Sequence, residues 1–535
     1  MKPATILVAL LLASLVVLLE WRSGALEAEF AAHPDEAAHY VSGLLVRDYI
    51  AAGFPQPALR FAEDYYLHYP KVAIGHWPPF FYVVQGVWML AFSPGRMSIM
   101  LLLALLASIL AMKVYTVVRD ECGVMVGATV AALLVCLPLM QEFSQAVMSE
   151  LLIALLSFYA AVSYGKYLDA PSWREAVKFG LLAVLAIMTN GKGLALALLP
   201  PFAILIGRRV HLARRLSFWL PALLVIVLCG PWYYLTTNRL AYVSSPSATH
   251  TKLAVLANGG VLIRSFGWLL FCVIAIGLAR KVLWPMWRSR VAGKWVALAS
   301  LILSVWTFHS YVNVYFEPRY AAAAIPALAA FLGAGLAWLA AKIARSGLRP
   351  AWSMALVLLL TVAAFAKETF LVRAKPPLGY PQLVSELLAS PQFRSSVFLV
   401  AGSASAEGAF IAEVAMHERR PGHIVLRASQ VLASSTWGGG RYRALFPDAE
   451  ATTAHLESIP VGILAFDTTP VSPPREHLRQ LAEVLRRYPH RWESLNFNEQ
   501  SSSTVRAYRL VGHEGKPIGK IRIDMSGKLG KVLEH

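Results

Sequence analysis

Cysteine and charge are both scarce in this chain of 535 residues. It has 4 cysteines, which all fall within or at the edge of apolar segments, at Cys122, Cys136, Cys229 and Cys272. The sequence therefore indicates neither a disulfide framework nor a thiolate metal site. Only 15% of the residues are charged and 57% are hydrophobic. This composition excludes an ordinary soluble protein.

Acidic residues are the scarcer charge type, with 31 Asp and Glu against 49 Lys and Arg, which gives a formal net charge of +18. Three basic turns between apolar runs, at 208–215, 280–294 and 342–349, contain no acid at all. Such turns are typical of the cytoplasmic side of a membrane protein, where anionic lipid headgroups attract them. Membrane topology thus explains the basic charge, and we expect membrane lipids but no nucleic acid as partners.

Long apolar runs dominate the first two thirds of the chain. Eleven of them approach the roughly 20 residues that cross a bilayer, at 5–19, 97–118, 122–139, 149–167, 176–189, 191–207, 216–235, 260–279, 295–312, 320–341 and 351–366. A twelfth stretch, 79–92, is short and begins at a proline pair, which favours a re-entrant or tilted helix. The sequence predicts a polytopic α-helical membrane protein with about 11–13 transmembrane helices. A cleaved signal peptide is the alternative for residues 3–19.

The composition changes after Ala366, where charges, prolines and short alternating segments replace the apolar runs. The patterns predict strands at 396–400, 423–427, 461–466 and 504–510, and helices at 406–418 and 474–488. We therefore expect a soluble α/β domain over 371–535 after a membrane domain over 1–370. Alternate crossings counted from the basic turns put this last domain and the acidic loop 21–76 outside the cytoplasm.

A carboxylate pair follows the first apolar run, in His33-Pro34-Asp35-Glu36. Charged groups beside a membrane span have little reason to be there unless they contact a headgroup, an ion or a reacting atom. The pair is therefore a candidate functional site. The structural alternative is a helix N-cap, where the macrodipole favours an acid.

Four further motifs follow this pair in order. They are Pro78-Pro79 before an aromatic run, Glu150 at the start of a later span, the turn Gly191-Lys192-Gly193, and Arg319-Tyr320 before a helix of small residues. Together the motifs resemble the family 39-like glycosyltransferases, membrane enzymes of the GT-C fold that include protein O-mannosyltransferases and bacterial aminoarabinose transferases. The resemblance covers about residues 1–370.

The resemblance implies a hexosyl- or pentosyltransferase that uses a polyprenyl-phosphate-linked sugar. The acceptor would be a lipid, a glycan or a protein on the outer side of the membrane. In such a reaction a carboxylate removes the proton of the acceptor hydroxyl as its oxygen attacks the anomeric carbon. Asp35 occupies the family's position for this base. We expect Glu36 to orient the segment or to contact the acceptor, with His39 and Glu150 on the acceptor side.

The leaving lipid phosphate is an anion that needs cations or N–H donors. The resemblance gives this role to Lys192, Arg319 and Tyr320; the alternatives are a simple loop charge for Lys192 and an interfacial anchor for the other two. Many relatives carry a lysine directly before the two prolines, where this chain has Trp77 preceded by His76. His76 is then a donor contact, a packing residue, or a ligand of a divalent metal together with Asp35. No cofactor is certain.

We expect an integral protein of the bacterial inner (plasma) membrane with its active site outside the cytoplasm. Two other classes stay open. A lipid or polysaccharide transporter would bind near the bilayer midplane. A lipid-linked glycan polymerase or ligase would depend on basic residues in a large late loop, and the loop 236–258 holds only Arg239 and Lys252. Polar candidates at one outer face favour the transferase.

Overall fold

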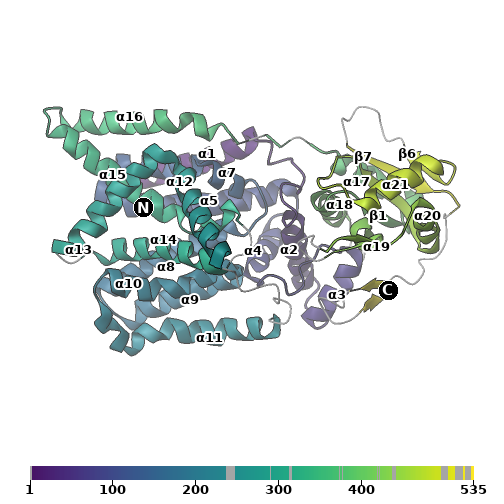
Figure 1. The fold of residues 1–535 in the computed structure, drawn as a ribbon, viewed down its shortest axis with the longest axis horizontal. Coiled ribbons are helices and arrows are strands. Elements are labelled where there is room, and N and C mark those ends of the chain that lie inside the picture. The colour runs from purple at the N-terminus through teal and green to yellow at the C-terminus, as the bar shows by residue number, and fades with distance from the viewer. Residues whose placement is uncertain are drawn as a thin grey trace. The chain divides into compact units, whose positions relative to one another are not determined.

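The protein folds into two compact units, which can be followed in the ribbon of Figure 1. The helical unit contains Met1–Ser23, Gly75–Phe81 and Met100–Ala374, and the α/β unit contains Gly24–Ile74, Tyr82–Ile99 and Lys375–His535. The structure is a computed structural model. It describes residues 3–236, 248–288, 291–312, 316–372, 374–375, 377–418, 420, 422–435, 441–495, 504–512, 522–524 and 532–534.

The helical unit consists of apolar helices joined by short turns. Its α-helices are α1 (Pro3–Arg22), most of α5 (Arg96–Cys122), α6 (Val124–Cys136), α7 (Pro138–Ser144), α8 (Glu150–Asp169), α9 (Trp173–Thr189), α10 (Leu199–Ile206), α11 (Leu216–Thr236), α12 (Ala248–Leu278), α13 (Trp284–Arg288), α14 (Gly293–Val312), α15 (Ile325–Ala344) and α16 (Pro350–Thr369). Shorter helical turns are η1 (Gly191–Leu198), η2 (Val210–Arg214), η4 (Ala279–Leu283) and η5 (Pro318–Ala321). Helices satisfy every backbone hydrogen bond internally, which lipid requires.

The predicted polytopic helical architecture is confirmed. Within the described residues, eight helices are long and apolar enough to cross a membrane, or nine if α6 and α7, which are bent by 66° to one another, form one span. The predicted spans at 176–189 and 191–207 correspond to shorter elements, a 17-residue α9 and the η1–α10 pair. The short stretch at 79–92 forms α4 (Phe80–Ala91). The expected total of 11–13 spans stays a prediction.

Glycines let helices α12 and α15 touch through their backbones. A Cβ atom on Gly277 of α12 would lie 2.0 Å from the Phe331 carbonyl oxygen of α15, and one on Gly335 of α15 would lie 2.1 Å from the Val273 carbonyl oxygen of α12. Lipid tails are as apolar as the side chains, so membrane helices associate through such close packing. The reciprocal contacts therefore fix how α12 and α15 pack.

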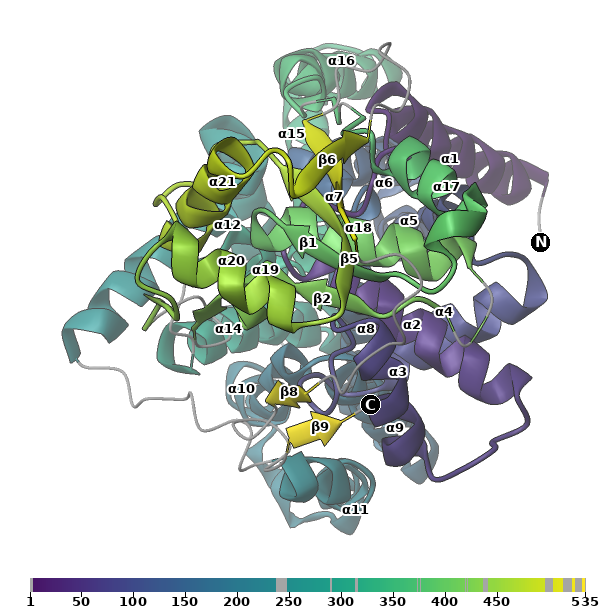
Figure 2. The same ribbon diagram turned by 90° about the vertical axis from the view of Figure 1, so that its right-hand side faces the viewer.

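The α/β unit contains a mixed sheet of five strands in the order β2-β1-β5-β7-β6 (Figure 2). The strands are β1 (Val397–Ala401), β2 (Val425–Arg427), β5 (Val461–Asp467), β6 (Trp492–Leu495) and β7 (Val505–Leu510). Strands β2, β1 and β5 pair in parallel, and β7 is antiparallel to both β5 and β6. Two separate ribbons pair β3 (Ala433–Ser434) with β4 (Arg443–Ala444) and β8 (Arg522–Asp524) with β9 (Val532–Glu534).

Helices on this unit come from both ends of the chain. They are α2 (Glu36–Ala51), α3 (Ala58–His68), most of α4, α17 (Tyr380–Ala389), α18 (Ala404–His417), α19 (Ala428–Val431), α20 (Ala449–Ser458) and α21 (Glu476–Arg487), with the turn η6 (Pro391–Phe393). The four predicted strands and both predicted helices of the C-terminal region are confirmed, as β1, β2, β5, β7, α18 and α21. The sequence patterns did not predict α17, α20 or the edge strand β6, in which two of the four residues are exposed.

Helix α18 packs directly on α2. A Cβ atom on Gly408 would lie 2.9 Å from the Ala37 Cβ and 2.7 Å from the Lys71 Cε, so only glycine lets the two helices approach this closely. On the same helix α18, the fully buried Glu413 pairs with Arg96. Residues 24–74 thus share a unit with the chain after Lys375, an arrangement that the predicted division into 1–370 and 371–535 does not contain.

The contact between α12 and α15 predicts a stability effect. We expect Gly335→Ala to lower the free energy of unfolding by about 1–3 kcal/mol, because the new methyl group forces the two backbones apart. Gly230→Ala on α11 is the matched control, since a Cβ atom there meets nothing within 4 Å. Thermal unfolding in detergent measures both. Equal melting temperatures for Gly335→Ala and the wild type would contradict the close backbone contact between α12 and α15.

Candidate functional site

Asp35 begins helix α2 without capping it through its side chain. It holds the N-cap position of α2, yet its carboxylate makes no capping hydrogen bond. Its carboxylate lies 3.5 Å from the His33 Nδ1 atom, and its backbone N–H donates to the same nitrogen at 3.1 Å. The Asp35 side chain is only 17% exposed. Asp35 therefore does not cap α2 through a side-chain hydrogen bond, while the helix macrodipole still favours an acid at this position.

Glu36 has a different role from its neighbour. It is buried, and its Oε2 atom accepts a hydrogen bond of 2.8 Å from the Ala32 backbone N–H. This contact closes the loop that precedes α2. From the other side, the buried Lys71 donates to the Pro34 carbonyl oxygen at 2.9 Å. Both contacts fix the backbone on which Asp35 is placed, and the orienting role of Glu36 stays a prediction.

His39 lies one helical turn after Asp35 and is buried. Its Nδ1 atom lies 3.1 Å from the Tyr82 hydroxyl group, and its backbone carbonyl oxygen accepts from the Gln85 side chain at 3.3 Å. Tyr82 and Gln85 both belong to α4. The start of α2 and the apolar helix α4 are therefore joined by polar contacts between buried groups.

In the helical unit, Lys192 and Glu150 form a buried ion pair. The Lys192 Nζ atom lies 2.5 Å from the Glu150 Oε1 atom, and the two side chains are 14% and 1% exposed. Asn190 holds the turn, because its side chain accepts from the Lys192 backbone N–H at 3.2 Å and donates to Ser149 at 3.2 Å. A Cβ atom on Gly193 would lie 2.5 Å from the Ala186 backbone, so the turn also needs its glycine.

Arg319 and Tyr320 join this pair. The centroid of the Tyr320 ring lies 5.2 Å from the Lys192 Nζ atom and 5.9 Å from the Arg319 Cζ atom. Both cations therefore lie within cation–π distance of the same ring. Arg319 also pairs with Glu317. The buried ring of His309 stacks on the Tyr320 ring, and the two ring centroids are 5.2 Å apart. Four predicted residues, Glu150, Lys192, Arg319 and Tyr320, thus form one cluster.

The other predicted residues lie elsewhere. Asp35, Glu36 and His39 belong to the α/β unit, while His76 belongs to the helical unit and packs edge-on against Trp77 with ring centroids 4.5 Å apart. The predicted pairing of His76 with Asp35 as metal ligands stays a prediction. Within the described part of the chain, no group of three His, Cys, Asp or Glu side chains could hold a metal ion. Part of the late loop 236–258, including Arg239, lies outside the described residues.

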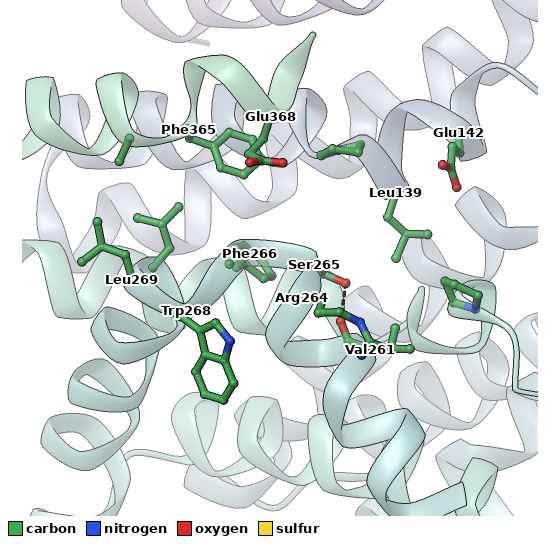
Figure 3. Close-up of a pocket in the computed structure, with 15 residues that line it drawn as sticks. Leu139, Glu142, Val261, Arg264, Ser265, Phe266, Trp268, Leu269, Phe365 and Glu368 are labelled. Atoms are coloured by element: carbon green, nitrogen blue, oxygen red, sulfur yellow. Dashed lines mark hydrogen bonds between the residues drawn. The ribbon is translucent and has the colours of Figure 1, made fainter. Parts of the chain in front are cut away.

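The helical unit also contains a pocket of about 470 Å³. Figure 3 shows Arg264 and Phe266 of α12 on one side and Phe365 and Glu368 of α16 on the other. Leu139 and Glu142 of α7 line it as well, together with Pro318, the residue directly before Arg319. The pocket is therefore mostly apolar with a few charged groups, and it reaches the chain segment that carries Arg319 and Tyr320.

Arg264 is the residue that the sequence analysis missed. It stands inside a predicted apolar span, and the structure leaves its side chain exposed and lining the pocket. Helix α12 breaks three residues later at Gly267, where φ is 74° and ψ is 159°. A charged residue inside an apolar run is by itself a signal of function, and it was available in the sequence. His309 carried no comparable signal, because only its stacking on Tyr320 distinguishes it.

No protein-family model and no curated protein matches this sequence. Solved structures match over most of the chain. ArnT from Cupriavidus metallidurans bound to undecaprenyl phosphate aligns over 95% of this chain and 99% of its own, with a TM-score of 0.57 and 15% identity. The archaeal oligosaccharyltransferase AglB from Archaeoglobus fulgidus, in complex with an inhibitory peptide and a dolichol-phosphate, aligns over 87% and 70%, with a TM-score of 0.54 and 13% identity. An AglB complex with Zn and sulfate matches at a TM-score of 0.52.

At these identities the likeness concerns the fold. Both neighbours are GT-C membrane proteins with a C-terminal soluble domain that includes a small sheet. This chain has the same fold class, as its motifs predicted. The family 39 assignment within that class stays a prediction.

The buried pair Glu150–Lys192 can be tested without any substrate. We expect Glu150→Ala to lower the free energy of unfolding by about 3–5 kcal/mol, because it removes the main counter-charge of a buried ammonium group. The double variant Glu150→Ala/Lys192→Met should recover most of this loss, since it removes the charge itself. Thermal unfolding in detergent is the measurement. A double variant as unstable as Glu150→Ala would show that the charge of Lys192 does not depend on Glu150.

Proposed function

We propose that this protein is a membrane glycosyltransferase that moves a sugar from a polyprenyl-phosphate donor to an acceptor outside the cytoplasm. The observation that carries the proposal is the pocket with Arg264 in a GT-C fold. An arginine on an apolar helix needs an anionic partner or water. A lipid phosphate that pairs with Arg264 and places its prenyl chain along the apolar wall fits this part of the pocket, which also contains the carboxylates of Glu142 and Glu368.

The donor site in this proposal combines the pocket with the Lys192 cluster. Arg264 and Arg319 neutralise the phosphate, and Tyr320 packs on the first prenyl units or donates a hydrogen bond. Lys192 shares its charge between Glu150 and the phosphate, so it contributes less than an unpaired cation would. His76 adds a further donor contact. Undecaprenyl phosphate and dolichol-phosphate in the neighbouring structures belong to the same chemical class of ligand.

The acid–base step falls to Asp35. The acceptor hydroxyl gives its proton to the Asp35 carboxylate while its oxygen attacks the anomeric carbon. The bond from that carbon to the phosphate oxygen breaks, and the polyprenyl phosphate leaves with the bonding electrons. Glu36 and Lys71 keep the backbone of Asp35 in place through Ala32 and Pro34. In this scheme His39 and Glu150 lie on the acceptor side. The acceptor is a lipid, a glycan or a protein.

The proposal places the protein in the bacterial inner membrane with Asp35 on the outer side. The acid-free basic turns support this orientation, since such turns are typical of the cytoplasmic face. A divalent metal is a further element of the proposal, and transfer measured with and without EDTA decides it. Loss of turnover with EDTA, restored by added metal, supports a metal-dependent reaction, and unchanged turnover removes the metal.

One observation favours a second candidate function. Helix α12 is broken at Gly267 inside a span and beside a pocket that contains charged groups, and broken helices with intramembrane charges are typical of transporters. A lipid transporter would move a lipid-linked sugar without cleaving it. Purified protein that binds polyprenyl-phosphate sugars but never releases the sugar onto an acceptor would favour this candidate.

Asp35→Asn tests the base. We expect turnover to fall about 10²- to 10⁴-fold, the usual contribution of a positioned general base, while donor affinity stays within about twofold. Radiolabelled sugar transfer from polyprenyl-phosphate monosaccharides to membrane extract measures the first quantity and equilibrium binding the second. Asp64→Asn is the control, because Asp64 is an exposed acid of the same unit. Wild-type turnover in Asp35→Asn would remove Asp35 from this role.

Arg264→Gln tests the donor pocket. We expect donor affinity to fall about tenfold or more, since a charge-assisted hydrogen bond to phosphate is worth at least about 1.5 kcal/mol. Arg280→Gln is the control, because Arg280 follows the same helix but does not line the pocket. The binding assay with labelled polyprenyl phosphate measures both. Equal loss in the two variants would mean that general charge, and not the pocket, attracts the donor.

A further inference from the structure

A second pocket of about 370 Å³ lies at the arginine-rich end of the helical unit. It is lined by Ile206, Gly207, Arg208, Arg209, His211, Met286 and Val291. Three of these residues are basic and none is acidic. The pocket shares no lining residue with the one in Figure 3. None of the roles proposed for the transferase uses it.

Arg209 is the buried centre of this pocket. Its side chain is 2% exposed, and its Nη2 atom donates to the Asp169 Oδ1 atom at 3.0 Å and to the Val291 carbonyl oxygen at 2.9 Å. Its Nε and Nη1 atoms are buried and have no hydrogen-bond partner among the described residues. A buried charged donor without an acceptor costs free energy. The pocket therefore contains an arginine with two N–H groups that lack an acceptor among the described residues.

The carboxylate of Asp169 does not supply this need. It accepts one N–H of Arg209, and both of its oxygens also accept from the Gly293 backbone N–H, at 2.9 and 3.0 Å. One carboxylate thus balances one guanidinium, and the exposed Arg208 and His211 add uncompensated basic character at the rim. Arg208 holds a left-handed backbone conformation, with φ of 52°. The site as a whole favours an anion.

The surroundings of the pocket are apolar and aromatic. Leu205 and Val210 are more than half exposed beside it, and Trp287 is 76% exposed with the Arg208 guanidinium 5.8 Å from its ring. Exposed tryptophans next to cations are typical of the membrane interface, where headgroups meet acyl chains. A soluble anion would gain nothing from these exposed apolar side chains, whereas a phospholipid places its phosphate among the arginines and its chains along them.

We propose that this pocket binds the phosphate headgroup of an anionic phospholipid. The phosphate accepts hydrogen bonds from Arg208 and His211 at the rim, and the positive charge of the buried Arg209 attracts it from within the pocket. Basic pockets between membrane helices are known to bind anionic headgroups in this way. A bound lipid then joins α10, the turn after it and α13, because all three contribute lining residues. The proposal does not depend on the proposed transferase reaction.

Lipid binding by the purified full-length protein tests this site. Native mass spectrometry in detergent would measure the affinity for phosphatidylglycerol, for zwitterionic phosphatidylcholine as comparison, and for phosphatidylglycerol in the presence of inorganic phosphate. The test variant is Arg208→Gln/His211→Gln, because both side chains are exposed and line the pocket. The control is Arg214→Gln/Arg215→Gln, which removes two exposed arginines from the same turn outside the pocket.

We expect the wild type to prefer phosphatidylglycerol over phosphatidylcholine, and the test variant to bind phosphatidylglycerol about tenfold more weakly than the control variant. Arg209→Met should lose this preference. Its melting temperature shows whether the variant is folded; if Arg209→Met does not fold, the Arg208→Gln/His211→Gln variant alone decides the test. Equal weakening in the test and control variants would overturn the proposal in favour of general attraction to the basic turn. Displacement of the lipid by millimolar inorganic phosphate would overturn it in favour of a free-phosphate site.

Discussion

The pairing of buried charges is the constraint on which both units of this protein depend. An ionised group in an apolar interior is tolerated only with a partner of opposite charge and satisfied hydrogen bonds. Ion pairs in which at least one side chain is almost fully buried join distant segments of the described chain, among them Glu150 with Lys192, Arg96 with Glu413, and Arg209 with the half-exposed Asp169. Each pair lies next to a feature to which we assign a function. An ion pair that holds a buried charge in place also holds the surrounding backbone in place.

The first pair sets the character of the proposed donor site. Lys192 lies in a turn between apolar helices, where Asn190 and Gly193 leave the backbone little freedom. Its ammonium group is held by Glu150 and faces the Tyr320 ring. A preorganised cation of this kind stabilises developing negative charge without first having to reorient. The exposed Arg264, by contrast, is a cation without such a fixed position and fits the binding of a mobile lipid headgroup.

The second pair belongs to the contact of α18 with α2. Because Gly408 lets these helices touch and Glu413 holds Arg96, the helix that begins at Asp35 is a structural part of the α/β unit. A ligand or partner that shifted α18 would therefore shift the start of α2. This gives the C-terminal region a physical connection to the proposed base that its sequence did not reveal.

Local patterns in the sequence were enough to predict the polytopic helical class, four strands and two helices of the C-terminal region, and the polar candidates. Hydrophobic period, run length and charge are local properties, so they can be read without long-range contacts. Only the tertiary structure decided that Lys192 is paired with Glu150, that His309 stacks on Tyr320, and that Arg264 and Arg209 line pockets. These features arise between segments distant in the chain, where the cost of burying a charge is settled by which partner the fold brings to it.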